Sequence, residues 1–510
     1  MRQQDGYSVS NNADQLKQSL LQENNVNIFD VFALLYLYCE PIFHTIRPKL
    51  ANTDTYRHFI LDVQKLQGST LPPARNALAP LDLGNRMTLA SSLCPNSNQS
   101  NFDLQCFTLL RAIDGTYDNM SARSTNLSNF PTMPQHLNLN TEIARVYTKK
   151  PSPLHSLVQQ MITHSSGNGG RCGPLRTGID MGDYLRDYVY NLACLTLPAG
   201  YKFDFSGLES SVRLCFPDDL GNCKIALFPL IDQTSRMETQ FFELDSQNKR
   251  PFLITGLTET DKVAAQTLDI LRQLSKQDVT VVIFPELSVP EGVRRAISRA
   301  LEQGLYSSIK MVIASSCHEQ LGNEWYNTAY VFGPDGQLLW QQRKLQPYTL
   351  MHYEAERLSS FAKFADYDLY EGISTEPRVI VVRDTPMGRM AILICSDLLR
   401  TDSHRKLLFD AGVNCIVVPT MSAALKPDFI TAAEQFAIHS QAMILVSNAC
   451  AVVREAASEG TTKAKVSFAF LPAYPSIRWC HCDIPPGQCP NPQCCEDFII
   501  RLGSWPLNFE

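Results

Sequence analysis

The chain has 510 residues, which is enough for two or three domains of ordinary size. Its net charge of −6 at pH 7 lacks the basic excess that marks a nucleic-acid surface. Its strongest apolar run, residues 31–39, is far shorter than the roughly 20 residues that span a bilayer.

No basic, apolar leader follows Met1, and the first residues are mostly polar. The sixteen cysteines are scattered, and several, such as Cys194, Cys215 and Cys415, lie inside apolar runs. Disulfide frameworks are expected in small secreted domains rather than in a large chain without a secretion signal. We therefore expect reduced thiols and a soluble cytoplasmic protein.

Residues 1–200 predict a mostly helical, loop-rich domain of unknown role. Apolar residues recur at helical spacing in four segments, which are 27–47, 57–66, 154–163 and 183–195. A long polar stretch, residues 119–140, predicts an extended or irregular connection. The Gly-rich residues 165–173 lack the Lys-Ser/Thr ending of a phosphate-binding loop, so they indicate a turn.

Residues 201–510 show a different pattern, in which short apolar strands alternate with helices. The predicted strands are 224–230, 251–256, 279–284, 309–315, 329–332, 338–341, 379–382, 390–394, 414–419 and 443–447. The predicted helices are 261–274, 291–303, 403–411 and 429–441. This alternation is typical of an α/β domain whose sheets are covered by helices.

Three chemically active residues stand at the ends of predicted strands. Glu286 follows an apolar strand, Lys344 follows the strand 338–341, and Cys395 ends the strand 390–394. In open α/β sheets, functional groups gather at the carboxyl ends of strands, so we expect these three side chains to converge. Each alone has an ordinary explanation: a buried core cysteine, a surface carboxylate and a solvated lysine.

Together, the three residues form a set that nucleophilic catalysis requires. A cysteine attacks a carbonyl or nitrile carbon only as the thiolate, which is a small fraction of a free thiol at neutral pH. Glu286 would accept the thiol proton and later pass it to a leaving amine. Lys344 would favour the thiolate and stabilise the oxyanion, with the backbone N–H of Ser396 as the second oxyanion donor.

Longer motifs around these residues carry a family resemblance. In order, they are Phe284-Pro285-Glu286-Leu287, the segment 326–336 leading to Arg343-Lys344-Leu345, and Ile394-Cys395-Ser396-Asp397, flanked by 411–420 and 429–448. Over about residues 251–453 this resembles the carbon–nitrogen hydrolase (nitrilase/amidase) superfamily, whose triad is Glu–Lys–Cys. The resemblance does not extend to residues 1–200.

The resemblance implies an α-β-β-α sandwich, self-association into a homodimer or higher homo-oligomer, and no metal or organic cofactor. It also implies an auxiliary glutamate beyond the lysine, for which Glu354 and Glu356 are candidates and Glu354 is preferred. Ser396 is smaller than the Tyr, Trp or Glu that many members have after the nucleophile. The substrate therefore does not transfer from any one branch of the family.

The C-terminal segment 480–495 departs from the family pattern. Cysteines at four positions, Cys480, Cys482, Cys489 and Cys494, are candidate ligands of a structural zinc ion. Their spacing differs from the usual pair of Cys-x2-Cys knuckles, so a reduced, partly buried surface loop is the alternative.

Two functions follow from the whole sequence. The first is a cysteine-dependent hydrolase of a non-peptide C–N bond, with an amide preferred over a nitrile, acting through a thioester acyl-enzyme. The second is a sensing or oligomerising module whose nitrilase-like pocket binds a ligand. In that case residues 1–200 would be the effector or the partner-binding part.

Overall fold

The structure is a computed structural model of the protein. It describes residues 28–50, 53–69, 71, 81–93, 99–116, 137–139, 142–148, 185, 189, 192–196, 201–204, 216–217, 220–245, 249–400, 404, 408, 411–422, 427–440, 442–455, 464–471, 474–482 and 498–502. The chain divides into two compact units, one centred on Met1–Lys150 and Gly173–Pro198, the other on Ala199–Phe409 and Val413–Glu510. The domain boundary near residue 200 stays a prediction.

The first unit combines helices with a small antiparallel sheet. Its helices are α2 (Ile28–Leu50), α3 (Thr53–Ser69), α4 (Leu83–Ser92) and α5 (Gln99–Thr116). They share a core that includes Phe32, Phe43 and Phe107, and the Phe59 ring stacks on Phe107 at 5.3 Å between centroids. The helices expected at 27–47 and 57–66 are therefore confirmed, whereas α4 and α5 were not expected.

The small sheet of this unit corrects one prediction. It has the strand order β1 (Leu137–Leu139), β2 (Glu142–Thr148) and β3 (Leu192–Thr196). The helix predicted over 183–195 is therefore wrong at its end, because residues 192–195 pair with β2. Residues 154–163 and 165–173 lie outside the described residues.

The second unit contains two large sheets. The first has the order β13 (Leu338–Arg343), β12 (Thr328–Phe332), β9 (Met311–Ser315), β8 (Val281–Ile283), β5 (Lys224–Leu227) and β22 (Ile499–Arg501). The second has the order β21 (Tyr474–Cys482), β20 (Ala464–Leu471), β19 (Met443–Asn448), β18 (Cys415–Thr420), β17 (Gly388–Ile392), β16 (Arg378–Thr385) and β4 (Tyr201–Asp204). Both are rich in fully buried Val and Ile, as expected of strands covered on two faces.

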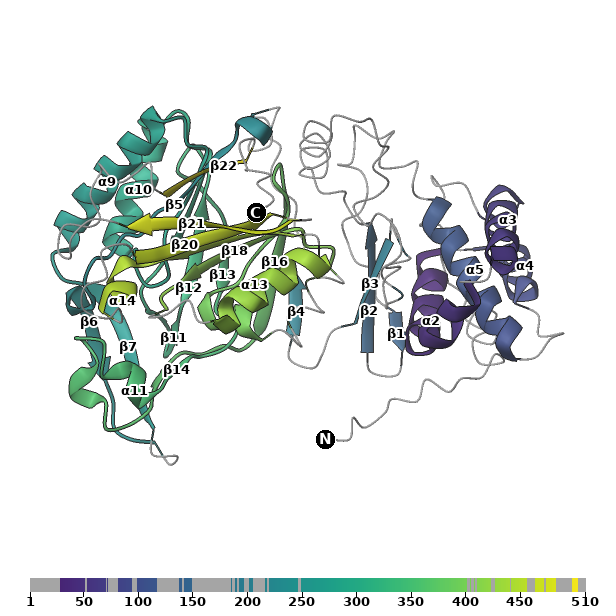
Figure 1. The fold of residues 1–510 in the computed structure, drawn as a ribbon, viewed down its shortest axis with the longest axis horizontal. Helices are drawn as coiled ribbons and strands as arrows, with labels where there is room; N and C mark the ends of the chain where they lie inside the picture. Colours follow the sequence, from purple (N-terminus) through teal and green to yellow (C-terminus); the bar gives the residue numbers. More distant parts are fainter. Residues whose placement is uncertain are drawn as a thin grey trace. The chain divides into compact units, whose positions relative to one another are not determined.

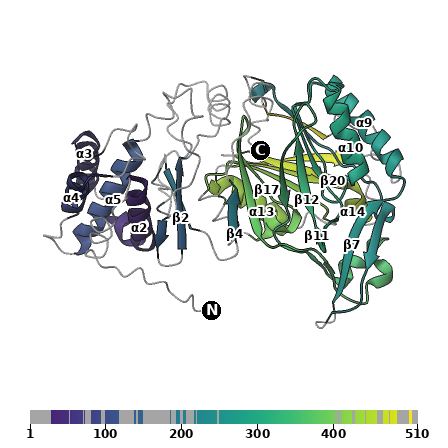
Figure 2. The same cartoon turned by 180° about the vertical axis from the view of Figure 1, so that it is seen from behind.

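Helices cover the outer faces of the two sheets. These are α9 (Thr260–Lys276) and α10 (Glu291–Glu302) on the first sheet, and α13 (Pro427–Ser440) on the second, as Figures 1 and 2 show. Each helix presents one apolar stripe to the core; in α10 it is Val293, Ile297, Ala300 and Leu301. The result is the α-β-β-α sandwich that the sequence predicts.

Buried polar contacts tie the two sheets together. The side chain of Gln342 on β13 donates to the carbonyl of Val379 at 2.9 Å and accepts from the N–H of Val381 at 2.8 Å, both on β16. The hydroxyl of Ser447 on β19 donates to the carbonyl of Ile283 on β8 at 2.9 Å. These bonds fix the relative position of the sheets at the level of the strand ends.

Smaller elements complete this unit. They are a sheet of order β14 (Thr349–Leu350), β15 (Leu369–Glu371), β7 (Arg250–Leu257) and β6 (Met237–Phe241), a hairpin of β10 (Glu319–Leu321) and β11 (Glu324–Tyr326), the helices α11 (His352–Ala355) and α14 (Cys450–Glu455), and the 3-10 helices η4 (Leu220–Asn222), η5 (Thr234–Arg236), η6 (Ala362–Phe364) and η7 (Cys395–Leu399). Most of the helix predicted at 403–411 lies outside the described residues.

Strand directions bring several strand ends to one edge. In the first sheet β5, β8 and β9 are parallel, and β13 runs with them because β12 is antiparallel to both β9 and β13. In the second sheet β17, β18 and β19 are parallel. The residues that follow β8, β13, β17 and β18 can therefore meet, which is the basis of the site described next.

Candidate active site

Glu286 and Lys344 form a buried ion pair. Glu286 follows β8, Lys344 follows β13, and each is 2% exposed. The Nζ of Lys344 lies 2.8 Å from Oε1 of Glu286. Burial lowers the pKa of the Lys344 ammonium, but Glu286 and Glu371 outweigh burial and raise that pKa well above its ordinary value. The lysine is therefore charged at neutral pH.

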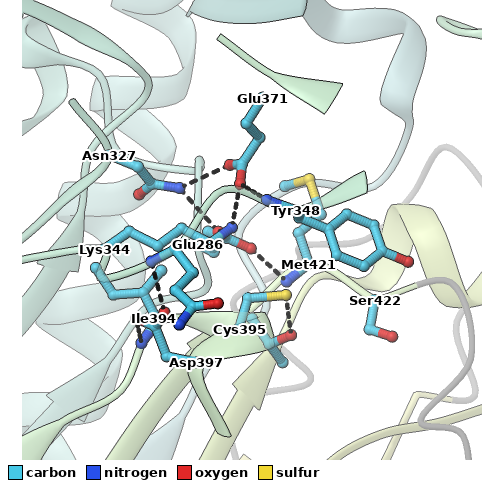
Figure 3. A network of polar contacts seen from close by, with 12 residues as sticks. Glu286, Asn327, Lys344, Tyr348, Glu371, Ile394, Cys395, Asp397, Met421 and Ser422 are labelled. Carbon is cyan, nitrogen blue, oxygen red and sulfur yellow. Dashed lines mark hydrogen bonds and ion pairs between the residues drawn. The ribbon is translucent and has the colours of Figure 1, made fainter. Parts of the chain in front are cut away.

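Glu371, which the sequence did not single out, is the second carboxylate at this lysine (Figure 3). It ends β15, and its Oε2 lies 2.6 Å from Nζ of Lys344 and accepts from the backbone N–H of Tyr348 at 2.7 Å. Burial opposes ionisation of Glu371, but Lys344 and the N–H of His318 outweigh it and lower the pKa of this carboxyl. Glu371 is therefore a fixed negative charge.

Two neutral side chains hold the carboxylates in place. One amide group, Nδ2 of Asn327, donates to Glu286 at 2.8 Å and to Glu371 at 3.2 Å. Nδ1 of His318 accepts from the backbone N–H of Ile254 at 2.8 Å, so the ring proton is on Nε2, 3.1 Å from Glu371. His318 is thus a neutral donor, and Lys344 carries the positive charge between the two glutamates.

Cys395 stands where β17 gives way to η7, in a left-handed backbone conformation with φ of 50°. A non-glycine residue in this region is strained, and such strain concentrates at functional sites. Its sulfur accepts from the hydroxyl of Thr420 at 3.2 Å. The N–H of Met421 faces both this sulfur and Oε2 of Glu286, from which it lies 3.2 Å.

The thiol of Cys395 is protonated at rest. The residue is 6% exposed, and burial, together with the charge of Glu286, raises the pKa of the thiol to about 12. Lys344, Thr420 and Met421 act in the opposite direction. Nucleophilic attack therefore needs a base nearby, and the network supplies Glu286.

Asp397 connects the cysteine turn with the lysine segment. Its carboxylate accepts from the N–H of Ile394 at 3.2 Å and from those of Leu345 and Gln346 at 3.1 Å. Burial raises the pKa of Asp397 to about 7, although Lys344 and these N–H groups oppose the rise. The contacts fix the residue after Lys344 against the turn that carries Cys395.

The remaining predicted site residues lie around this network. Ser396 is the second residue of η7, where a helix leaves its N–H without an intrahelical acceptor. Glu354, on α11, accepts from the hydroxyl of Tyr348 at 3.0 Å and from the N–H of Met351 at 3.2 Å. Glu356 is exposed. Among described residues, the ion-pair partners of Lys344 are Glu286 and Glu371.

The C-terminal cysteines are only partly described. Cys480 is buried near the end of β21, and Cys482 is the last residue of that strand, so these two belong to the second sheet. Cys489 and Cys494 lie outside the described residues. Within the described part of the chain, no three His, Cys, Asp or Glu side chains are grouped to hold a metal ion. A zinc site stays a prediction.

The structure thus places a buried Glu–Lys pair and a cysteine on a strained turn in one polar network within an α-β-β-α sandwich. Residues 253–463 match the carbon-nitrogen hydrolase family. No curated protein matches the chain.

Solved structures of an amidase are similar to part of the chain. The amidase from Nesterenkonia sp. is 16% identical, with a TM-score of 0.34 over 52% of this chain and 88% of that one. A mutant of the amidase from Nesterenkonia sp. AN1, with the acetamide moiety of fluoroacetamide covalently added at the active-site cysteine, is 14% identical, with a TM-score of 0.34 over 53% of this chain and 90% of that one. No described helix is long and apolar enough to cross a membrane.

Proposed function

We propose that the protein hydrolyses a non-peptide C–N bond, most simply that of an amide, through a thioester on Cys395. The observation that carries this proposal is the single network in which Glu286, Lys344 and Cys395 meet from three strand ends. The family match of residues 253–463 supports the same reaction class.

The roles follow from charge and hydrogen bonding. Glu371 accepts hydrogen bonds from His318, Asn327, Lys344 and Tyr348, so its charge is fully engaged. Glu286 is the carboxylate that shares a donor, the Met421 N–H, with the sulfur. Glu286 is therefore the base that takes the thiol proton, while Glu371 keeps Lys344 charged and in place.

The oxyanion that forms on the substrate carbonyl needs hydrogen-bond donors. As the thiolate attacks, negative charge develops on the carbonyl oxygen, and the Lys344 ammonium lies within the same buried network. The N–H of Ser396 is the natural second donor because it follows the nucleophile directly. Glu286 then gives its proton to the leaving amine or ammonia, and later activates water for hydrolysis of the thioester.

The test is covalent trapping by intact mass spectrometry. Wild-type protein incubated with a panel of small amides and nitriles should gain the mass of an acyl group, and Cys395→Ala should not. Cys317→Ala is the matched control, because Cys317 is also buried and its sulfur donates to the carbonyl of Leu287, outside the network. Trapping should be unchanged in that variant.

Two results of this experiment would count against the proposal or the assay. Wild-type protein that binds a ligand but never acylates across the panel would overturn hydrolysis. It would favour the ligand-sensing module instead. If the acyl adduct is absent from Cys317→Ala as well as from Cys395→Ala, the trapping does not report on this site.

A further inference from the structure

Thr420 and Cys395 lie at the ends of two neighbouring strands. The strands β17 and β18 are parallel, and their last paired residues are Ile392 and Val417. Thr420 is the last residue of β18, and Cys395 begins the 3-10 helix η7 that follows β17. Thr420 is fully buried, and its Oγ1 donates to the sulfur at 3.2 Å. The contact therefore joins the end of β18 to the turn that carries Cys395.

A hydroxyl in this position acts differently on the two forms of sulfur. A threonine hydroxyl has one O–H donor, and here that donor points to the sulfur. Hydrogen bonds to ionised acceptors are shorter and stronger than those to neutral ones. The bond should thus be stronger when Cys395 is a thiolate than when it is a thiol or a thioester.

The buried surroundings of the sulfur make the Thr420 hydroxyl important for stabilising the thiolate. Burial and the charge of Glu286 disfavour the thiolate, whereas Lys344, Thr420 and the N–H of Met421 favour it. Lys344 is already engaged by two carboxylates. Thr420, in contrast, donates its hydrogen bond to the sulfur itself.

We propose that Thr420 is a further catalytic residue, whose hydroxyl stabilises the Cys395 thiolate as it forms and again as it leaves the acyl-enzyme. This inference rests on the proposed role of Cys395 as nucleophile. It adds a side-chain donor at the sulfur to the Glu–Lys–Cys set that the sequence predicts.

The reaction balances with Thr420 as a donor that keeps its proton. Glu286 takes the thiol proton, the C–S bond forms, and the carbonyl electron pair moves to oxygen. The tetrahedral intermediate collapses, the C–N bond breaks, and the amine leaves with the proton from Glu286. Glu286 next takes a proton from water, which adds to the thioester. The C–S bond then breaks, the carboxylic acid leaves, and the electron pair of that bond returns to the sulfur beside the Thr420 hydroxyl. Glu286 finally gives its proton back to the sulfur, which restores the thiol.

The experiment measures thiolate formation without any substrate. Cys395 is alkylated with iodoacetamide between about pH 7 and pH 10, and its peptide is followed by mass spectrometry in wild type, Thr420→Val and Thr420→Ser. Loss of one hydrogen bond to the thiolate should raise the pKa by about one unit. Because a more basic thiolate is also more nucleophilic, Thr420→Val should react about threefold more slowly at each pH. Thr420→Ser should stay close to wild type.

Controls separate this effect from a loss of packing. Thr267→Val also removes a fully buried hydroxyl, but one that donates to the carbonyl of Val263 within α9, so its alkylation rate should equal the wild-type rate. Thermal unfolding of each variant identifies a protein that has not folded. If Thr420→Val misfolds, Thr420→Ala and Thr420→Ser provide the same comparison of a site without and with the hydroxyl.

Failure of the proposed role of Thr420 can be distinguished from failure of the proposed function. Thr420→Val that is alkylated at the wild-type rate overturns the role of Thr420, whatever substrate the enzyme accepts. Wild-type protein that never acylates overturns amide hydrolysis, whatever the alkylation rates are. With an amide that acylates the enzyme, Thr420→Val should also slow both formation and hydrolysis of the thioester.

Discussion

The ammonium nitrogen of Lys344 lies 2.6 Å from Oε2 of Glu371, closer than its 2.8 Å contact with Glu286. The two carboxylates and one ammonium leave one net negative charge in a buried site. Removing one partner of a buried ion pair is far more damaging than removing an exposed pair. Glu371 is therefore as important to the geometry of Lys344 as Glu286 is.

The first prediction compares two glutamates. Glu371→Gln keeps the shape of the side chain but removes the charge that holds Lys344, so kcat/KM for an acylating amide should fall about 100-fold. Glu354→Gln should have a smaller effect, because its described partners are Tyr348 and Met351. Steady-state kinetics of both variants decide the matter. A larger loss in Glu354→Gln would instead support Glu354, the residue preferred from the sequence, as the auxiliary glutamate.

The second prediction concerns acid stability. The pKa of Glu371 is lower in the folded protein than its ordinary value. Such a carboxyl stabilises the fold fully above the unfolded pKa of about 4.3, and this contribution is lost as the pH falls toward the folded pKa. The wild type should therefore lose stability below about pH 4 more steeply than Glu371→Gln does. Thermal unfolding at a series of acid pH values measures the two slopes, and equal slopes would contradict the prediction.

The sequence predicts the parts of the site that follow recognisable strands. Glu286, Lys344 and Cys395 each stand within three residues of the end of a strand that the sequence predicts, and parallel strand directions bring these ends together. The structure places them as this reasoning expects. The α/β class is predictable from the alternation of strands and amphipathic helices, whereas the α-β-β-α sandwich was an implication of the family resemblance.

Glu371 and His318 were missed for a physical reason. Glu371 ends a strand of three residues, too short to show a period, and its position depends on the parallel pairing of β15 with the distant β7. The ring of His318 is oriented by a hydrogen bond that it accepts from the backbone N–H of Ile254, which is 64 residues away. Contacts set by long-range pairing leave no local pattern. The one available signal was a glutamate at a strand end.

The third prediction tests how the two sheets are joined. Gln342 is 1% exposed and bonds the backbone of β16 twice, so Gln342→Leu removes the bond to the buried Val381 N–H and the bond to the Val379 C=O. We expect a loss of about 2 kcal/mol or more in the free energy of unfolding. Gln341→Leu, at the exposed neighbouring position, should change stability little. Denaturant unfolding compares them, and similar values for both would show that the cross-link contributes nothing.

The fourth prediction uses two glycines with similar backbone angles. Gly336, in the turn between β12 and β13, has φ of 76°, and a Cβ there would lie 2.1 Å from the carbonyl oxygen of Ser298 on α10. Gly304 has φ of 67° with nothing within 4 Å of such a Cβ. Gly304→Ala should therefore lose only the conformational term of about 1 kcal/mol, whereas Gly336→Ala should lose about 2–4 kcal/mol.

Thermal unfolding of both alanine variants separates backbone strain from steric overlap. The difference between them reports how tightly the turn packs on α10, where the Ser298 hydroxyl also donates to the Gly336 carbonyl at 2.7 Å. Because this turn precedes β13, a displaced turn should also shift Lys344 and lower kcat/KM in Gly336→Ala but not in Gly304→Ala. Equal unfolding temperatures in the two variants would mean that the turn moves away from α10 without penalty, and the close contact would then have no part in positioning the lysine.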